Sequence, residues 1–138
     1  VVIVATSTLA WGGQVLSWLA PDLAGRLGLA EVEADVDRTF WLDARGEAVW
    51  DALVLWTMPL AGILLVADHD WWAYAGLIGG GSYLYFAGRG ILVRLTMAGN
   101  GVRVGSESSV RTAIAALAIW GVVAAITIVA SIAALETA

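Results

Sequence analysis

Several residue types are missing or scarce in this chain of 138 residues. It has no cysteine, which excludes disulfides, thiolate catalysis and cysteine-ligated zinc or iron–sulfur centres. It has no lysine, one histidine and two prolines. Charged residues make up only 14% of the chain, against about 25% in soluble domains. The net charge of −5 argues against a nucleic-acid partner, because such binding depends on basic patches.

Apolar residues, in contrast, make up 60% of the chain. A soluble domain of this size cannot bury that much apolar surface, because small domains bury the smallest fraction of theirs. The composition therefore predicts an integral membrane protein with the lipid bilayer as its first partner.

Four apolar runs approach the length of about 20 residues that a helix needs to cross a bilayer. They cover about 1–20, 48–67, 71–92 and 112–135. None alternates in the way that barrel strands do, so we predict an all-α, integral membrane four-helix bundle that forms one domain over 1–138. Residues 1–10 carry no positive charge, so the first run is expected to be a retained helix rather than a signal peptide.

Helix-breaking and helix-capping residues agree with these limits. Pro21 should end the first helix, since the residue before a proline avoids helical angles. Pro59 lies inside the second run and should kink it, freeing a carbonyl near Leu55. Ser106 is one of three serines that can cap the fourth helix.

The basic residues predict the orientation of the chain. All seven are arginines, and with four spans all seven fall on one side of the membrane: Arg26, Arg38, Arg45, Arg89, Arg94, Arg103 and Arg111. The positive-inside rule places that side in the cytoplasm, together with an acidic loop at 21–47. Both termini are then expected outside a plasma or inner membrane.

Ionisable residues inside the spans are the strongest functional candidates, because charge in a bilayer is costly. Asp51 and Arg89 are predicted to pair near the inner interface, and Glu47 and Arg94 to form a second pair one turn further in. A structural ion-pair ladder is one interpretation, with Arg89 extending toward water. The other is a proton or ion path.

The turn Asp68-His69-Asp70 holds the only histidine. Such a cluster can bind a metal or take part in acid–base chemistry, but a lone histidine in a turn is more typical of a plain polar connection. No metal site is predicted, and no protease, phosphate-loop or dinucleotide motif is present.

Small and aromatic residues fill the spans. Small residues let membrane helices approach closely, and those predicted to pack are Gly79, Gly80, Gly81, Gly121 and Ala125. Side chains at depth that can meet a bound lipid or pigment are Gln14, Trp11, Trp56, Tyr83 and Trp120. The sequence requires no cofactor and identifies none.

Together these features predict a non-catalytic multi-pass membrane protein, acting as a subunit or scaffold that packs against other membrane subunits or against copies of itself. One alternative is a small-solute or ion transporter or channel that uses Asp51 and Arg89. A second alternative is a membrane enzyme or redox accessory that uses Asp68, His69 and Asp70.

Overall fold

The computed structural model describes residues 1–137, and within that range the chain is helical without β-strands. The elements are α1 (Val2–Leu19), α2 (Pro21–Arg26), the 3-10 helix η1 (Glu33–Asp35), α3 (Arg38–Val54), α4 (Thr57–Val66), α5 (Trp72–Gly99) and α6 (Glu107–Glu136). The predicted all-α class and the end of the first helix before Pro21 are confirmed.

Three helical segments are long and apolar enough to cross a membrane: Val2–Leu19, Arg38–Val66 and Glu107–Glu136. Their outward surface is apolar, as Ile119, Val122 and Ile126 on α6 are 59–62% exposed. Such a surface suits lipid rather than water. The chain is therefore compatible with an integral membrane protein.

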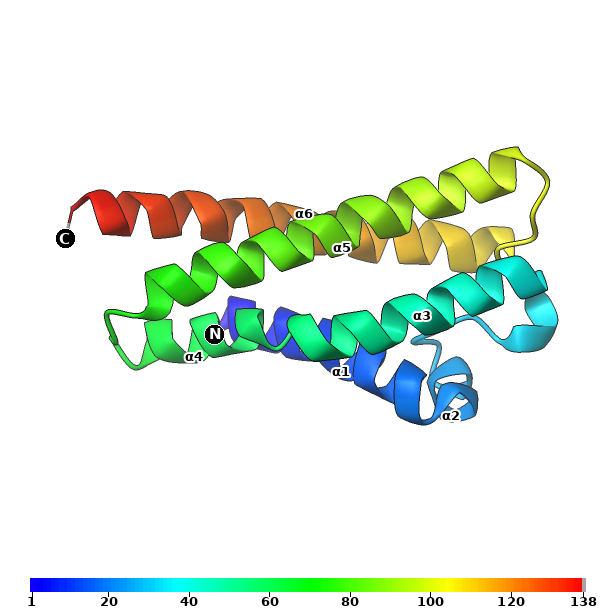
Figure 1. Ribbon diagram of the computed structural model, residues 1–138, viewed down its shortest axis with the longest axis horizontal. Helices are drawn as coiled ribbons and strands as arrows, with labels where there is room; N and C mark the ends of the chain where they lie inside the picture. Colours follow the sequence, from blue (N-terminus) through cyan, green and yellow to red (C-terminus); the bar gives the residue numbers. More distant parts are fainter. Residues whose placement is uncertain (138) are drawn as a thin grey trace.

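The long helices lie side by side, with α5 beside both α6 and α4, and α1 beside α3 and α4 (Figure 1). α1 and α6 have few contacts with each other. The helices thus pack against one another in the order α6, α5, α4 and α1. The sparse contact between α1 and α6 is called the seam below.

The predicted break at Pro59 is present. α3 ends at Val54 and α4 begins at Thr57. The Leu55 carbonyl accepts from the Met58 N–H at 3.3 Å, because Pro59, the residue that would donate to it in a regular helix, has no N–H.

Glycines let α5 approach its neighbours closely. A Cβ at Gly79 would lie 2.7 Å from the Met58 backbone, and one at Gly80 would lie 2.6 Å from Ile128. A Cβ at Gly121 would lie 3.3 Å from Ala87. These three predicted packing glycines thus lie at contacts within the chain. Gly81 and Ala125 do not, since both are exposed.

The helix ends that carry the arginines gather at one end of the molecule. Arg45 donates to the Ser17 and Trp18 carbonyls and so caps the C-terminus of α1. Val36 and Val104 form an isolated antiparallel bridge, and with Phe40 they make a small buried core there. The segment 21–47, predicted to be a loop, instead contains α2, η1 and the first half of α3. α3, α5 and α6 also extend past the predicted spans, and their added turns supply Phe40, Met97 and Val110 to this small core.

Candidate binding cavity

A cavity of about 560 Å³ lies between α1 and α6 near the arginine-rich end; we call it the α1–α6 cavity. Its volume falls within the range of about 300–1,000 Å³ that is typical of small-molecule sites. Along α6 its lining extends from Ser106 to Trp120, about 21 Å at 1.5 Å per residue. The cavity is thus long enough to hold an extended molecule.

The part of the cavity toward the middle of the molecule is apolar. Ala10, Phe86 and Leu117 line it and are nearly fully buried. Trp120 also lines it, and its Nε1 donates to the Thr6 carbonyl at 3.0 Å, which joins α6 to α1. That hydrogen bond links the two helices at the apolar end of the cavity.

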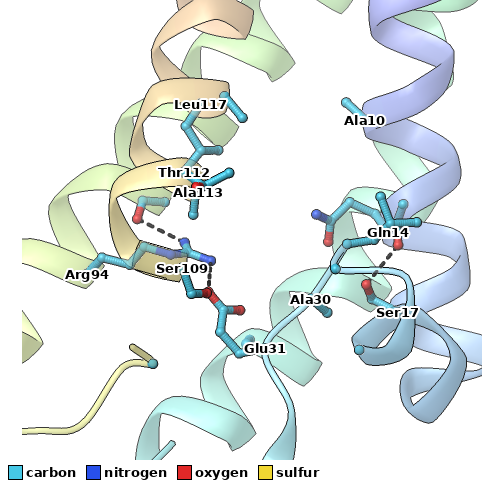
Figure 2. A pocket seen from close by; sticks show the side chains of 18 of the residues that line it. Ala10, Gln14, Ser17, Ala30, Glu31, Arg94, Ser109, Thr112, Ala113 and Leu117 are labelled. Carbon is cyan, nitrogen blue, oxygen red and sulfur yellow. Dashed lines mark hydrogen bonds and ion pairs between the residues drawn. The ribbon is translucent and has the colours of Figure 1, made fainter. Parts of the chain in front are cut away.

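The part toward the arginine-rich end is polar. Gln14 and Ser17 on α1 face Ser109 and Thr112 on α6, and Glu31 and Arg94 lie beneath them (Figure 2). Lining residues such as Leu9 and Thr112 are also exposed on the outer surface. The cavity is therefore amphipathic and reaches the surface along the seam between α1 and α6.

Arg94 pairs with Glu31, not with the predicted Glu47. Its Nη2 lies 3.0 Å from Glu31 Oε1, and its guanidinium lies over the Phe40 ring at 5.4 Å. Glu31 had been predicted only as part of an acidic surface. It was missed because the chain after α2 folds back beneath the helices, which no local pattern in the sequence reveals.

Arg89 pairs with Asp43 and Glu47, each at 2.7 Å, and not with the predicted Asp51. The Gly79–Met58 contact sets the register of these two antiparallel helical segments and places the Arg89 backbone about level with residue 48. From there the Arg89 side chain extends toward the arginine-rich end of the molecule. It therefore reaches Glu47 and Asp43 and turns away from Asp51.

Asp51 is left without an ionic partner among residues 1–137. It is 2% exposed, and its Oδ2 has no hydrogen-bond partner in that part of the chain. It does not line the α1–α6 cavity. A buried carboxyl group of this kind is costly to the fold.

Of the five predicted ligand-contacting residues, Gln14 and Trp120 line the cavity. Trp11 and Tyr83 instead join helices, through Nε1 to the Ala52 carbonyl at 2.9 Å and through the hydroxyl to the Ser7 carbonyl at 2.6 Å. Trp56 is exposed, lies in the break between α3 and α4, and donates through Nε1 to the Leu53 carbonyl of α3 at 2.9 Å.

The turn 68–70 is exposed and lies between α4 and α5, at the opposite end of α5 from the cavity. Asp68 has a φ of 51°, and His69 Nδ1 accepts from the Trp71 N–H at 3.2 Å. Among residues 1–137 no three potential metal ligands cluster here or elsewhere. The contacts of His69 thus shape the turn.

Comparison of the chain with protein-family models, with curated proteins and with solved structures finds no match. The functional conclusions below therefore depend on the geometry of the chain itself.

Proposed function

We propose that α1, the α3–α4 segment, α5 and α6 all cross the bilayer as a four-helix bundle. α5 has 28 residues, a length of about 42 Å, more than a hydrocarbon core of about 30 Å requires. Its lower apolarity reflects glycines packed against α4 and α6 and two arginines near its end. With four crossings every arginine lies on the cytoplasmic side of a plasma or inner membrane, and both termini lie outside.

We propose that this protein has a non-catalytic role and binds an amphipathic small molecule that enters from the bilayer. The observation that carries this proposal is the α1–α6 cavity, which is apolar toward the bilayer centre and polar toward the arginine-rich end. The same order of apolar and polar regions occurs in one leaflet of a bilayer. A lipid-like molecule would therefore fit the cavity in the orientation that it has in the leaflet.

The seam between α1 and α6 supports lateral entry. The two helices have few contacts, and the Trp120–Thr6 hydrogen bond is the polar link that joins them along the described chain. Exposed lining residues such as Leu9 lie on this seam. A molecule dissolved in the leaflet would meet the opening without passing through water.

The sequence predicts a packing subunit, and the contacts of the structure give that role less support. Of the five small residues that motivated it, Gly79, Gly80 and Gly121 lie at contacts inside the chain, whereas Gly81 and Ala125 are exposed. Association with other membrane subunits or with a second copy remains a prediction. A transporter that uses an Asp51–Arg89 pair lacks the pair on which it depended.

Photolabelling tests the proposed function. The protein is placed in lipid nanodiscs and irradiated with a long-chain alcohol that carries a diazirine and an alkyne. Ala116 lines the cavity, whereas Ala118 on the same helix faces outward. We expect labelled peptides from α1 and α6, strongly reduced labelling in Ala116→Phe, and wild-type labelling in Ala118→Phe.

The control variant makes the outcome decisive. Ala118→Phe adds the same bulk to the same helix without entering the cavity. Equal labelling of the two variants, or labels confined to outward-facing residues, would mean that the probe contacts the protein only as bulk lipid, and the proposed function would be wrong.

A further inference from the structure

We infer that the molecule bound in the α1–α6 cavity has an uncharged, hydrogen-bonding head, a hydroxyl or a carbonyl group, and that Gln14 recognises it. This inference rests on the proposed function and specifies its ligand class. It is drawn from the hydrogen bonds and ion pairs of the polar side chains that line the cavity. Some of these side chains have partners within the chain, and others have none.

The charged groups in the buried part of the lining are already paired, whereas Asp35 is exposed at the edge of the cavity and has no ion pair among residues 1–137. Arg94 is 3.0 Å from Glu31, and Glu47 is 2.7 Å from Arg89. The side chains of Glu31 and Arg94 are only 9% and 14% exposed. An ionic head would have to displace one of these partners and leave a buried charge uncompensated, which is costly. The buried part of the lining therefore disfavours both anionic and cationic heads.

Three hydroxyl groups of the lining are also engaged. Ser17 Oγ donates to the Gly13 carbonyl at 2.7 Å, and Thr112 Oγ1 donates to the Ser108 carbonyl at 3.0 Å. Ser106 Oγ accepts from the Ser109 N–H and caps α6. Each of these hydroxyl groups is thus bonded to the backbone of its own helix.

Gln14 differs from them. Its side chain points from α1 into the cavity (Figure 2), and its amide forms no hydrogen bond with any of residues 1–137. Ser109 lies across the cavity on α6, and its hydroxyl likewise has no partner within that range. Gln14 is only partly buried and its amide is open to the cavity, so this position is suited to a ligand that supplies hydrogen bonds.

An amide both donates and accepts, which matches a hydroxyl or a carbonyl head and gives no advantage to a charge. Above Gln14 the lining becomes apolar, with Ala10, Leu117 and Trp120. The expected ligand is thus a long apolar molecule with one neutral polar end, such as a long-chain alcohol or a molecule with a carbonyl-bearing ring.

Three probes with the same diazirine-bearing tail test the inference. They end in a hydroxyl, a carboxylate or a quaternary ammonium group, and labelling of the cavity is measured over the background in Ala116→Phe. We expect the hydroxyl probe to label the wild-type protein about tenfold more than either charged probe, because burying an unpaired charge is costly. In Gln14→Leu the hydroxyl probe should lose about fivefold, as for one hydrogen bond.

Thr8→Val is the matched control, since Thr8 also lies on α1 but is exposed and does not line the cavity. It should leave the hydroxyl preference unchanged. If the carboxylate probe labels best, Arg94 rather than Gln14 recognises the head and the inference is overturned, while the proposed function stands. Best labelling by the ammonium probe, or an unchanged preference in Gln14→Leu, overturns it in the same way. If no probe labels above the Ala116→Phe background, the proposed function itself fails.

Discussion

The Arg89 guanidinium on α5 lies 2.7 Å from the Glu47 carboxylate on α3 and, through its other terminal nitrogen, 2.7 Å from Asp43. One cation thus holds two carboxylates that are one helical turn apart. Because α3 and α5 otherwise have few contacts, this bridge is a main link between them at the arginine-rich end.

Replacing Arg89 with Met should therefore destabilise the fold. The variant keeps the apolar stem but leaves Glu47, whose side chain is 13% exposed, without its cation. Breaking a fully buried pair costs about 3–5 kcal/mol, and since Arg89 is itself 26% exposed, we expect about 2 kcal/mol after allowing for solvent screening. Unfolding in mixed detergent micelles measures this loss.

Arg111→Met supplies the control for that measurement. Arg111 pairs with Glu107 at 3.5 Å, and both side chains are at least 75% exposed. Its removal should change the unfolding free energy by less than about 0.5 kcal/mol. Equal effects of the two substitutions would show that the bridge to Glu47 and Asp43 does not stabilise the fold.

Gly79→Ala should separate α4 from α5. The added Cβ would lie 2.7 Å from backbone atoms of Met58, and a backbone cannot move aside as a flexible side chain can. We expect a loss of about 1–3 kcal/mol, as for other overpacked interiors. Gly81→Ala is the matched control, because nothing lies within 4 Å of its Cβ. There the better helix propensity of alanine should stabilise the fold or leave it unchanged. A loss in Gly81→Ala as large as in Gly79→Ala would contradict this account of the α4–α5 contact.

The sequence was sufficient to predict the long apolar helical segments and some of their ends, but not α2, η1 or the first half of α3. Apolar runs of the right length, Pro21 and Pro59 gave the helical class, the end of α1 and the break before Thr57. These features are local, because each depends on the hydropathy of one segment or on a proline that lacks an N–H group.

The partners of the charged residues could not be predicted in the same way. Asp43, Glu47 and Asp51 recur every four residues on one face of α3, so the pattern alone does not say which of them Arg89 meets. That choice depends on the register between α3 and α5, which glycine contacts far from the charges set. The cavity depends on how α1 and α6 diverge and on where the chain after α2 returns, and no local pattern encodes either.

Asp51→Asn should stabilise the protein. Asp51 is 2% exposed, and one carboxylate oxygen has no partner among residues 1–137. Asparagine has nearly the same shape and removes the need to accommodate a charge, so we expect a gain of about 1 kcal/mol or more. Asp70→Asn, in the exposed turn, should have no effect. A clear loss of stability in Asp51→Asn would reveal a bound partner of the carboxylate that the fold alone does not provide.

The absence of cysteine makes the proposed topology directly testable, since any introduced thiol is unique in the chain. His69→Cys lies in the turn between α4 and α5, and Ser108→Cys lies at the start of α6. If α5 crosses the bilayer with the arginines inside, a membrane-impermeant maleimide added to intact cells should label only the first variant. The second should become reactive after the membrane is permeabilised. If α5 does not cross, the two positions lie on the same side, and both variants will react alike in intact cells.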